Sequence, residues 1–464
     1  MLREKQFYKT FSVLALSLAL HNLLSYSVNM MDMVMLGRYS QNAMSGVSLC
    51  NQVQFMLQML VEGAGEGAVV LGAQYWGSIL THFDCYNAWF RKSTRGFDGA
   101  AMRFGGGMAV VMFLIVRLVP EQLLNLLSND PLVIAEGVRY FQIVSWTYIL
   151  FTVTNILVAS LRSVGIVSIG YVISFSTLCI NICLNYLLIY GNCGFPELGV
   201  QGAAVATLVS RCIELLIVIL YLKFREKQLC LTLKKLVCMD TSYLRDYIRV
   251  SLPVLLNQAQ WGAAQMVQTG ILGHLGGDVT AANAIAVQAY QVLSVVAYGA
   301  SSASGIVVGK TIGAGDRATL KRLVHTLEVL FSAIGLLTGL TIFLLRRPLL
   351  TVFGGTLTEN ACRLSMQFMT VIAVTTVGTS YQVACDNGII RGGGDTAFSA
   401  KMNLISMWLI IVPLSALAAF RWELVPVVVF FLLKWDQLYK IIPVAIRLHS
   451  WKWVKVVTRN DSEV

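Results

Sequence analysis

Apolar segments of about 20 residues, free of Asp, Glu, Lys and Arg, recur along the whole chain. Two of them run from Phe11 to Met31 and from Phe141 to Leu161. A helix of about 20 residues is long enough to cross a bilayer. Inside lipid the backbone must satisfy its own hydrogen bonds, so only helices or a closed barrel can span it. These segments are too long and too continuously apolar for barrel strands, and they predict an all-α polytopic membrane protein.

The pattern divides the chain into about twelve transmembrane helices. The predicted spans cover residues 11–36, 46–74, 106–120, 137–160, 166–190, 200–222, 247–272, 281–309, 323–345, 362–390, 397–420 and 424–446. The basic start MLREKQFYK leads directly into the first of them. A signal peptide has a shorter apolar region and a small-residue cleavage site, so we predict that this segment is retained as the first membrane helix.

Composition agrees with a membrane protein, since 56% of the residues are hydrophobic and 13% are charged. The net charge of +11 could indicate a nucleic-acid partner, but the basic residues are distributed unevenly about the predicted spans. The outer segments and span ends hold only Arg38, Arg139, Arg346, Arg347, Arg363 and Arg421. This bias follows the positive-inside rule. It predicts a protein of the cytoplasmic (inner) membrane with both termini in the cytoplasm and no nucleic-acid partner.

The two halves of the chain carry similar patterns in the same order. MVMLGRYSQNAMSGVSL and VVLGAQYWG have counterparts in TGILGHLGGDVTAANAIAV and IVVGKTIGAGD, and ASLRSVG at 159–165 has one in GIIRGGGDT at 388–396. Such duplication is common in secondary transporters, whose substrates bind between the repeats. We predict six-helix bundles at 1–222 and 247–447, related by a parallel pseudo-twofold repeat. A basic cytoplasmic linker at 223–246 and a cytoplasmic tail at 448–464 complete the chain.

These features resemble the multidrug and toxic compound extrusion (MATE) family over essentially the whole chain. The resemblance is carried by DMVMLG at 32–37, GAQYWG at 72–77, LRSVG at 161–165, INICLNYLLIYG at 180–191, PELGVQGAAVAT at 196–207, SLPVLLNQAQWG at 251–262 and RGGGDT at 391–396. It implies twelve helices in two bundles. It also implies a secondary active antiporter that exports organic or cationic drugs and toxic compounds in exchange for H+ or Na+ by alternating access.

One segment departs from the family pattern. Residues 78–107, SILTHFDCYNAWFRKSTRGFDGAAMRFGGG, are mixed in composition and show no helical period. We therefore expect the third helix, at about 78–120, to be irregular. A local reading-frame error is the favoured explanation and a real divergence of the protein is the other.

Asp32 is the first candidate for coupling chemistry, because a charge inside the membrane is costly and needs a function or a partner. No Lys or Arg lies one helical turn away from it. A hydrogen-bonded structural carboxyl is the alternative reading. The resemblance implies that Asp32 is the cation-coupling acid of the first bundle. It also implies that the acid is surrounded by four polar residues: Asn155, Asn181, Asn185 and Thr207. Many relatives carry a second Asp where this chain has Asn185, which leaves the coupling ion open between H+ and Na+.

Polar residues of the second half are candidates for the substrate cavity: Gln258, Gln260, Gln288 and Asp386. Arg211 and Glu214, three residues apart on one predicted helix, are expected to form a structural ion pair. Glu62 and Glu66 lie one turn apart in the second span and receive no role from the sequence.

Other function classes find little support in the sequence. Gly309-Lys310-Thr311 ends like a phosphate-binding loop, but the earlier glycine of that motif falls on Ser304. Neither HExxH nor GxSxG occurs, and the five histidines and ten cysteines are scattered. We expect no enzyme, no metal, no cofactor beyond the coupling ion, and a monomer that needs no ATPase subunit and meets only small organic substrates and lipids. A flippase for a lipid-linked precursor and a non-transporting membrane scaffold remain alternatives.

Overall fold

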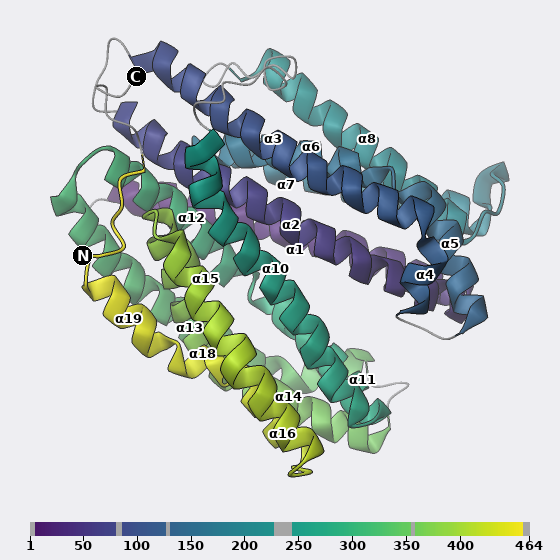
Figure 1. Ribbon diagram of the computed structural model, residues 1–464. Coiled ribbons are helices and arrows are strands. Elements are labelled where there is room, and N and C mark those ends of the chain that lie inside the picture. The colour runs from purple at the N-terminus through teal and green to yellow at the C-terminus, as the bar shows by residue number, and fades with distance from the viewer. Residues whose placement is uncertain (1–4, 80–85, 127–129, 227–243, 354–357, 458–464) are drawn as a thin grey trace. The chain divides into compact units, whose positions relative to one another are not determined.

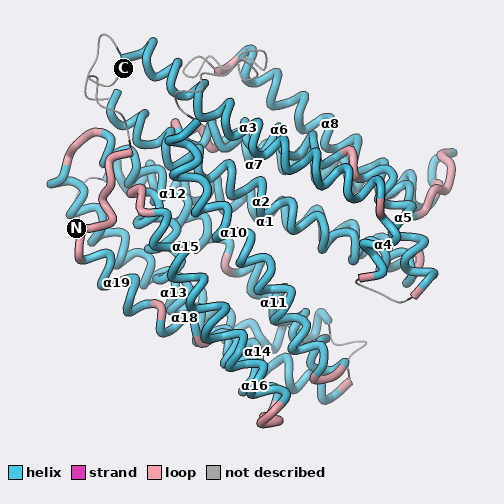
Figure 2. Tube along the Cα trace, viewed as in Figure 1, coloured by secondary structure: helices cyan, strands magenta, loops and turns pink. Residues whose placement is uncertain are grey.

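The computed structural model describes residues 5–79, 86–126, 130–226, 244–353 and 358–457, and Figures 1 and 2 show that this part of the chain consists of helices joined by loops. Within it, nine helices are long and apolar enough to cross a membrane, or up to ten if one bent pair forms a single span. The prediction of an all-α polytopic protein is therefore confirmed. The chain forms two compact units. The N-terminal unit contains His21–Gly72 and Phe83–Gln258. The C-terminal unit contains Met1–Leu20, Ala73–His82 and Ala259–Val464.

The N-terminal unit is built from the first helices of the chain, and α1, α2 and α10 each continue beyond it. The helices are α1 (Lys5–Tyr39), α2 (Gln41–Ile79), α3 (Tyr86–Leu118), α4 (Pro120–Asn125), α5 (Pro131–Val144), α6 (Thr147–Ser163), α7 (Ser168–Tyr190), η1 (Asn192–Gly194), α8 (Val200–Phe224) and α10 (Leu244–His274). In this unit α7 packs along α8, and α3 packs along α6 (Figure 1). Its core includes Leu36, Val47 and Tyr148.

Small residues follow the turn between α7 and α8, and residues 191–199 of this turn contain no Lys or Arg. Gly191 ends α7 in the left-handed region, with φ at 68°, where glycine has no steric penalty. A side chain at Gly202 would collide with the backbone carbonyl of Leu188, and Ala203, Ala204 and Ala206 are buried beside it. The small residues therefore allow α8 to approach α7 closely, as expected for membrane helices.

Two stretches of the N-terminal unit differ from the expectation. The predicted span 137–160 is a bent pair, because α5 and α6 meet at an angle of 54°. The segment expected to be irregular is a continuous helix, α3, within the described residues. Phe97, Ala100 and Ala101 are buried, so a short apolar face is enough to seat α3 against α6 despite the mixed composition.

The C-terminal unit contains the rest of the helices. They are α11 (Gly277–Leu293), α12 (Val295–Gly313), α13 (Arg317–Phe353), α14 (Glu359–Val383), the π-helical turn η4 (Ala384–Ile390), α15 (Thr396–Leu404), the π-helical turn η5 (Ile405–Ile411), α16 (Val412–Phe420), α17 (Pro426–Lys434), α18 (Asp436–Tyr439) and α19 (Ile441–His449). Phe368 of α14 stacks on Phe430 of α17, with ring centroids 4.0 Å apart, in the core of this unit. The predicted span 281–309 is divided at Ser294 into α11 and α12.

The predicted linker and tail are described only in part. Residues 227–243 of the linker and 458–464 of the tail lie outside the described residues. The rest of the tail is folded, since Trp453 is fully buried and Lys455 Nζ lies 2.6 Å from Asp395 Oδ1. Arg447 also pairs with Asp395. The predicted domain boundaries at 222 and 247 stay a prediction.

Candidate functional site

Asp32 lies on α1 at a point where this helix is fixed against α7 by polar contacts on both sides. His21 Nδ1 is 3.0 Å from Gly170 O and 2.7 Å from Ser174 Oγ. Further along α1, Tyr190 Oη donates a hydrogen bond of 2.7 Å to Met35 O. These contacts hold the register of the two helices and place the carboxylate of Asp32 opposite the polar face of α7.

The carboxylate of Asp32 starts a chain of hydrogen bonds that crosses three helices. Asn185 Nδ2 donates to Asp32 Oδ1 at 2.5 Å and to Asn181 Oδ1 at 2.9 Å. Asn181 Nδ2 donates in turn to Thr207 Oγ1 of α8 at 3.5 Å. Asn181 and Asn185 share one helix face because they are four residues apart. Three of the four polar residues expected around Asp32 are thus brought together with it.

A small cavity lies beside this chain in the N-terminal unit. Its volume is about 10 Å³, which suits about one water molecule. The residues that line it are Val28, Asp32, Asn51, Gln54, Tyr140, Thr177, Asn181, Thr207, Ser210 and Arg211. A buried carboxylate, a polar wall and room for one water are the parts that a proton-binding site needs.

The cavity also contains residues that the sequence analysis did not select. Asn51, Gln54 and Tyr140 line it, and the only signal for them is a polar group inside an apolar span. Arg211 donates to Glu214 Oε2 at 2.6 Å, which is the ion pair that their spacing predicted. Its guanidinium also lines the cavity and lies 5.0 Å from the ring centroid of Phe151. Arg211 is therefore part of the site as well as part of an ion pair.

Asn155 stands apart from this site. It lies on α6, near Gly65, and it does not line the cavity. Its Oδ1 is buried without a hydrogen-bond partner among the described atoms. The structure thus gives Asn155 no contact with Asp32.

The two glutamates of α2 that the sequence left without a role have polar neighbours. Arg162 Nη1 lies 3.2 Å from Glu66 Oε1, and both side chains are largely buried. Gln58 Nε2 donates to Glu62 Oε1 at 2.9 Å. The signal that the sequence analysis missed was the pairing of Glu66 with the arginine of LRSVG, since buried opposite charges in apolar spans seek each other.

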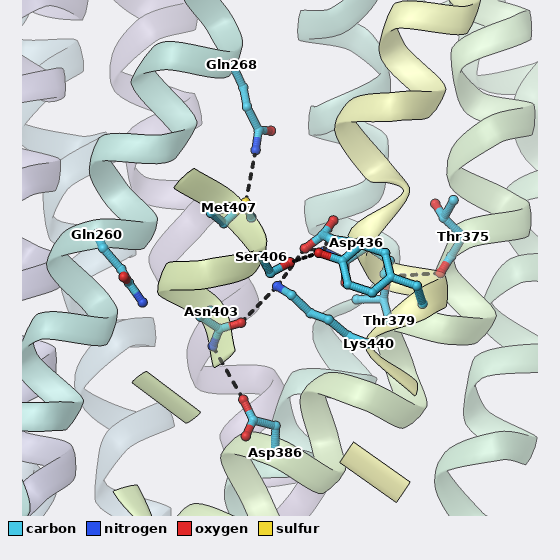
Figure 3. A network of polar contacts seen from close by, with 12 residues as sticks. Gln260, Gln268, Thr375, Thr379, Asp386, Asn403, Ser406, Met407, Asp436 and Lys440 are labelled. Atoms are coloured by element: carbon cyan, nitrogen blue, oxygen red, sulfur yellow. Dashed lines mark hydrogen bonds and ion pairs between the residues drawn. The ribbon is translucent and has the colours of Figure 1, made fainter. Parts of the chain in front are cut away.

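A second polar network lies in the C-terminal unit (Figure 3). Ser399 Oγ donates to Asp386 Oδ1 at 2.5 Å, and Asn403 Nδ2 donates to Asp386 Oδ2 at 3.5 Å. Gln260 Nε2 donates to Ala400 O at 3.2 Å on the same helix, α15. Of the polar residues predicted for the substrate cavity, Gln260 and Asp386 therefore meet around α15.

The remaining cavity candidates lie elsewhere. Gln258 falls in the N-terminal unit, and the side chain of Gln288 on α11 is exposed. The sequence analysis missed Asp436 and Lys440, whose spacing of four residues inside the last apolar span was the available signal. Lys440 Nζ lies 2.8 Å from both Asp436 Oδ2 and Asn403 Oδ1. In the part of the chain that the structure describes, no group of three His, Cys, Asp or Glu side chains could hold a metal ion.

Comparison with known proteins places this architecture in a family. The MatE family model matches residues 17–81, 99–187 and 253–417. The chain is 27% identical to the probable multidrug resistance protein NorM of Thermotoga maritima over 399 residues, which is 85% of this chain and 82% of that protein. It is 23% identical to the probable multidrug resistance protein YoeA of Bacillus subtilis over 415 residues, or 88% and 86% of the two chains.

Solved structures show the same fold at lower identity. A MOP superfamily transporter from Pyrococcus furiosus, described as having a binding pocket of reverse polarity, matches with a TM-score of 0.82 at 16% identity over 95% of this chain and 96% of that one. The Vibrio cholerae MATE transporter VcmN in its bent form matches with a TM-score of 0.77 at 15% identity over 95% and 98%. These likenesses concern the fold.

The family match is interrupted where the sequence departs from the family pattern. It stops at residue 81 and resumes at residue 99, inside the segment 78–107. The matched ranges nevertheless cover more than half of the chain and fall in both units. The chain therefore belongs to the MATE family of efflux transporters, a family of multi-pass membrane transporters rather than enzymes.

Proposed function

We propose that this protein is a secondary active antiporter that exports organic, often cationic, compounds in exchange for protons by alternating access. The observation that carries the proposal is the setting of Asp32. This carboxylate is 5% exposed, accepts its hydrogen bond from the neutral amide of Asn185 and adjoins a cavity of about one water. Among the described residues, Asp32 is the one acidic residue in the lining of this cavity, which Arg211 shares, and it offers one negative charge that one proton neutralises. Sodium is the second candidate ion.

Protonation of Asp32 changes the hydrogen bonds around it. The carboxyl becomes a donor through the oxygen that binds the proton, and if that oxygen is Oδ1, the amide nitrogen of Asn185 loses its acceptor there. Asn185 Oδ1 is buried without a hydrogen-bond partner among the described atoms. If the amide group rotates by half a turn, this oxygen can accept a hydrogen bond from the protonated carboxyl of Asp32. This turn also breaks the bond from Asn185 to Asn181. The charge of Asp32 thereby acts on Thr207 and α8 through Asn181.

Alternating access follows if the two protonation states favour different conformations. A proton from outside binds Asp32, the N-terminal unit rearranges, and the substrate leaves because its affinities for the two conformations differ. The proton is then released to the cytoplasm. In this scheme the protein resides in the cytoplasmic (inner) membrane with both termini in the cytoplasm. It works as a monomer among membrane lipids, without a nucleic-acid partner or an ATPase subunit.

Arg211 favours one alternative within transport, a flippase for a lipid-linked precursor with an anionic head group. Its guanidinium lines the cavity beside Asp32 and could attract a phosphate. The ion pair with Glu214, at 2.6 Å, offsets this positive charge. We therefore keep the flippase, like the non-transporting scaffold, as a secondary candidate.

The test is ethidium efflux from energised membrane vesicles with the pH and sodium gradients imposed separately. Proton antiport predicts efflux that follows the pH gradient and is unaffected by the sodium gradient. Efflux that follows only the sodium gradient would show that Na+ is the coupling ion. A protein that moves a fluorescent lipid but not ethidium would favour the flippase, and one that moves neither would favour the scaffold.

A further inference from the structure

The C-terminal unit contains a buried chain of charged and amide groups that the proposed mechanism does not use. It runs from Asp436 through the ammonium of Lys440 to Asn403 and on to Asp386. Figure 3 shows Asn403 between Lys440 and Asp386. Asp386 is 1%, Asp436 0% and Lys440 2% exposed. Charges buried this deeply in a membrane protein are expensive and are retained for a function or a strong mutual attraction.

Irregular backbone surrounds this chain. Asp386 lies in the π-helical turn η4, and Asn403 lies two residues before the second π-helical turn, η5. Ser406 of η5 contacts Tyr439 of α18, which fixes η5 to the segment that carries Lys440. π-Helical turns are rare and occur frequently at functional sites. The π-helical backbone and the buried charges thus both indicate a binding site.

The surroundings of the Lys440 ammonium are those of a monovalent cation. Its Nζ has oxygen neighbours at 2.8 Å in Asp436 Oδ2 and at 2.8 Å in Asn403 Oδ1. Hard cations prefer such carboxylate and amide oxygens. Asp436 contacts the ammonium directly, and Asp386 is linked to it through Asn403. The positive charges of Arg391 and Lys440 both act on Asp386. The positive charges that balance Asp386 and Asp436 are therefore supplied by the chain itself.

We propose that Asp436, Asn403 and Asp386 form a monovalent-cation site whose occupant is the ammonium of Lys440, so that the C-terminal unit takes up no sodium ion. A side-chain ammonium cannot diffuse away, so Na+ has to displace a tethered competitor that is always present at the site. The consequence for transport rests on the proposed function: coupling then depends on the proton at Asp32. Lys440 acts here as the residue that determines which cation the unit holds.

The experiment measures cation binding by thermal unfolding of the purified full-length protein, independently of transport. Unfolding midpoints are compared in choline chloride, sodium chloride and n-propylammonium chloride at equal ionic strength. n-Propylammonium matches the atoms that Lys440→Ala removes. A ligand that binds only the folded state raises the midpoint as its concentration rises. We expect the wild type to unfold at the same temperature in choline and sodium. Lys440→Ala should unfold at a lower temperature in choline and recover in sodium or n-propylammonium.

Two control variants make the result specific. Lys434→Ala removes a lysine six residues earlier, whose ammonium lies 5.9 Å from the ring centroid of Phe430, and should gain no response to sodium. Lys440→Ala combined with Asp436→Asn removes both charges and should fold in choline with a much weaker response. If Lys440→Ala yields folded protein only in sodium or n-propylammonium, that rescue supports the proposal.

Three outcomes would overturn the inference. One is a sodium-specific rise in the midpoint of the wild type that Asp386→Asn abolishes. Another is a folded Lys440→Ala variant that responds to neither cation. The third is a Lys440→Ala variant that does not fold in any of the three salts. None of these outcomes depends on ethidium efflux, so a failure of this inference is distinguishable from a failure of the proposed antiport.

Discussion

Asn185 on α7 donates a hydrogen bond of 2.5 Å to the carboxylate of Asp32 on α1, although the two residues are 153 positions apart in the chain. The same amide nitrogen donates to Asn181, so one side chain links the buried acid to the rest of the polar chain. This arrangement makes Asn185 the residue through which the charge of Asp32 reaches α7 and α8.

The first prediction concerns Asn185 and Asn155, two asparagines that sequence analysis treats alike. Asn185→Ala removes the donor from a buried carboxylate, and hydrogen bonds to charged groups contribute about 1.5–3 kcal/mol. If this energy is needed for coupling, export should fall by about 10- to 100-fold, since about 1.4 kcal/mol corresponds to tenfold. Asn155→Ala should leave export within about threefold of the wild type, because Asn155 makes no contact with Asp32. Ethidium efflux at equal expression measures both, and equal losses would contradict the assignment.

The second prediction concerns the ion pair between Arg162 and Glu66, whose side chains are 17% and 19% exposed. Removing one partner takes this counter-charge away from a largely buried charge, and breaking a fully buried pair costs about 3–5 kcal/mol. Here we expect about 1–3 kcal/mol for Glu66→Gln or Arg162→Gln, because of the partial exposure. The double variant should lose less than the sum of the single losses. Unfolding midpoints measure the cycle, and strictly additive losses would show that the pair does not interact.

The third prediction concerns Asp98, at the start of the buried part of α3. It is 1% exposed, and neither carboxylate oxygen accepts a hydrogen bond in the described part of the chain. The neighbouring hydroxyl of Ser160 donates its proton to Ile156 O. An unsatisfied buried polar group costs about 1–3 kcal/mol, and more if it is charged. Asp98→Leu should therefore raise the unfolding midpoint. A lower midpoint for Asp98→Leu would mean that the carboxylate has a role of its own.

The same residue bears on the segment that departs from the family. Asp98 is the last residue before the family match resumes at residue 99. Selection removes unsatisfied carboxylates from a protein core, whereas a reading-frame error can introduce one. Asp98 therefore fits the hypothesis of a reading-frame error. Resequencing the gene tests this hypothesis. Compensating insertions or deletions near codons 78 and 107 would support it, and an intact frame would leave a real divergence.

The fourth prediction concerns pH. At the surface of the C-terminal unit, hydrogen bonds from Asn360 and then Thr358 hold the pKa of Asp278 below its ordinary value, because they favour the charged carboxylate. The bonds measure 2.8 Å and 2.7 Å. A folded-state pKa below the unfolded one gives stability that is complete above the ordinary value of about 3.9. That stability is lost as pH falls through the folded pKa.

Asp278→Asn should therefore unfold at a lower temperature than the wild type at pH 7 and pH 5. The difference should shrink at pH 3, which lies below the ordinary pKa, because the unfolded wild-type chain then gains a proton at Asp278 and is stabilised by it. Asn360→Ala should behave in the same way, because it removes the larger cause of the shift. A difference between wild type and Asp278→Asn that is equal at all three pH values would show that the carboxylate charge contributes nothing.

Much of the fold could be predicted because the bilayer imposes a simple rule on the sequence. Long apolar segments must be helices, and the small residues after Gly191 must pack closely. The division of 281–309 at Ser294 could not be predicted, since a bend between α11 and α12 leaves the apolar pattern unchanged. The part of α3 before the predicted span 106–120 was expected to be irregular because periodicity was the only criterion, whereas packing against α6 decides it.

The parts of the candidate site that lie on a single helix could be predicted from residue spacing and polarity. Asn181 and Asn185 share a face by spacing alone, and Asp32 is conspicuous as a charge in an apolar span. Contacts between distant helices were not predictable in the same way. The sequence contains Lys440 and Asn403 in different spans, and only the fold brings them to 2.8 Å. For the same reason Arg211 was recognised as a partner of Glu214 but not as a wall of the cavity.

The central claim is that Asp32 carries the proton that exchanges for substrate. The most direct measurement uses proteoliposomes with purified protein and a pH-sensitive dye inside, and it follows proton movement driven by an ethidium gradient alone. The account predicts proton flux opposite to ethidium in the wild type and no flux above empty liposomes for Asp32→Asn, with both proteins folded. Undiminished ethidium-driven proton flux in Asp32→Asn would contradict it.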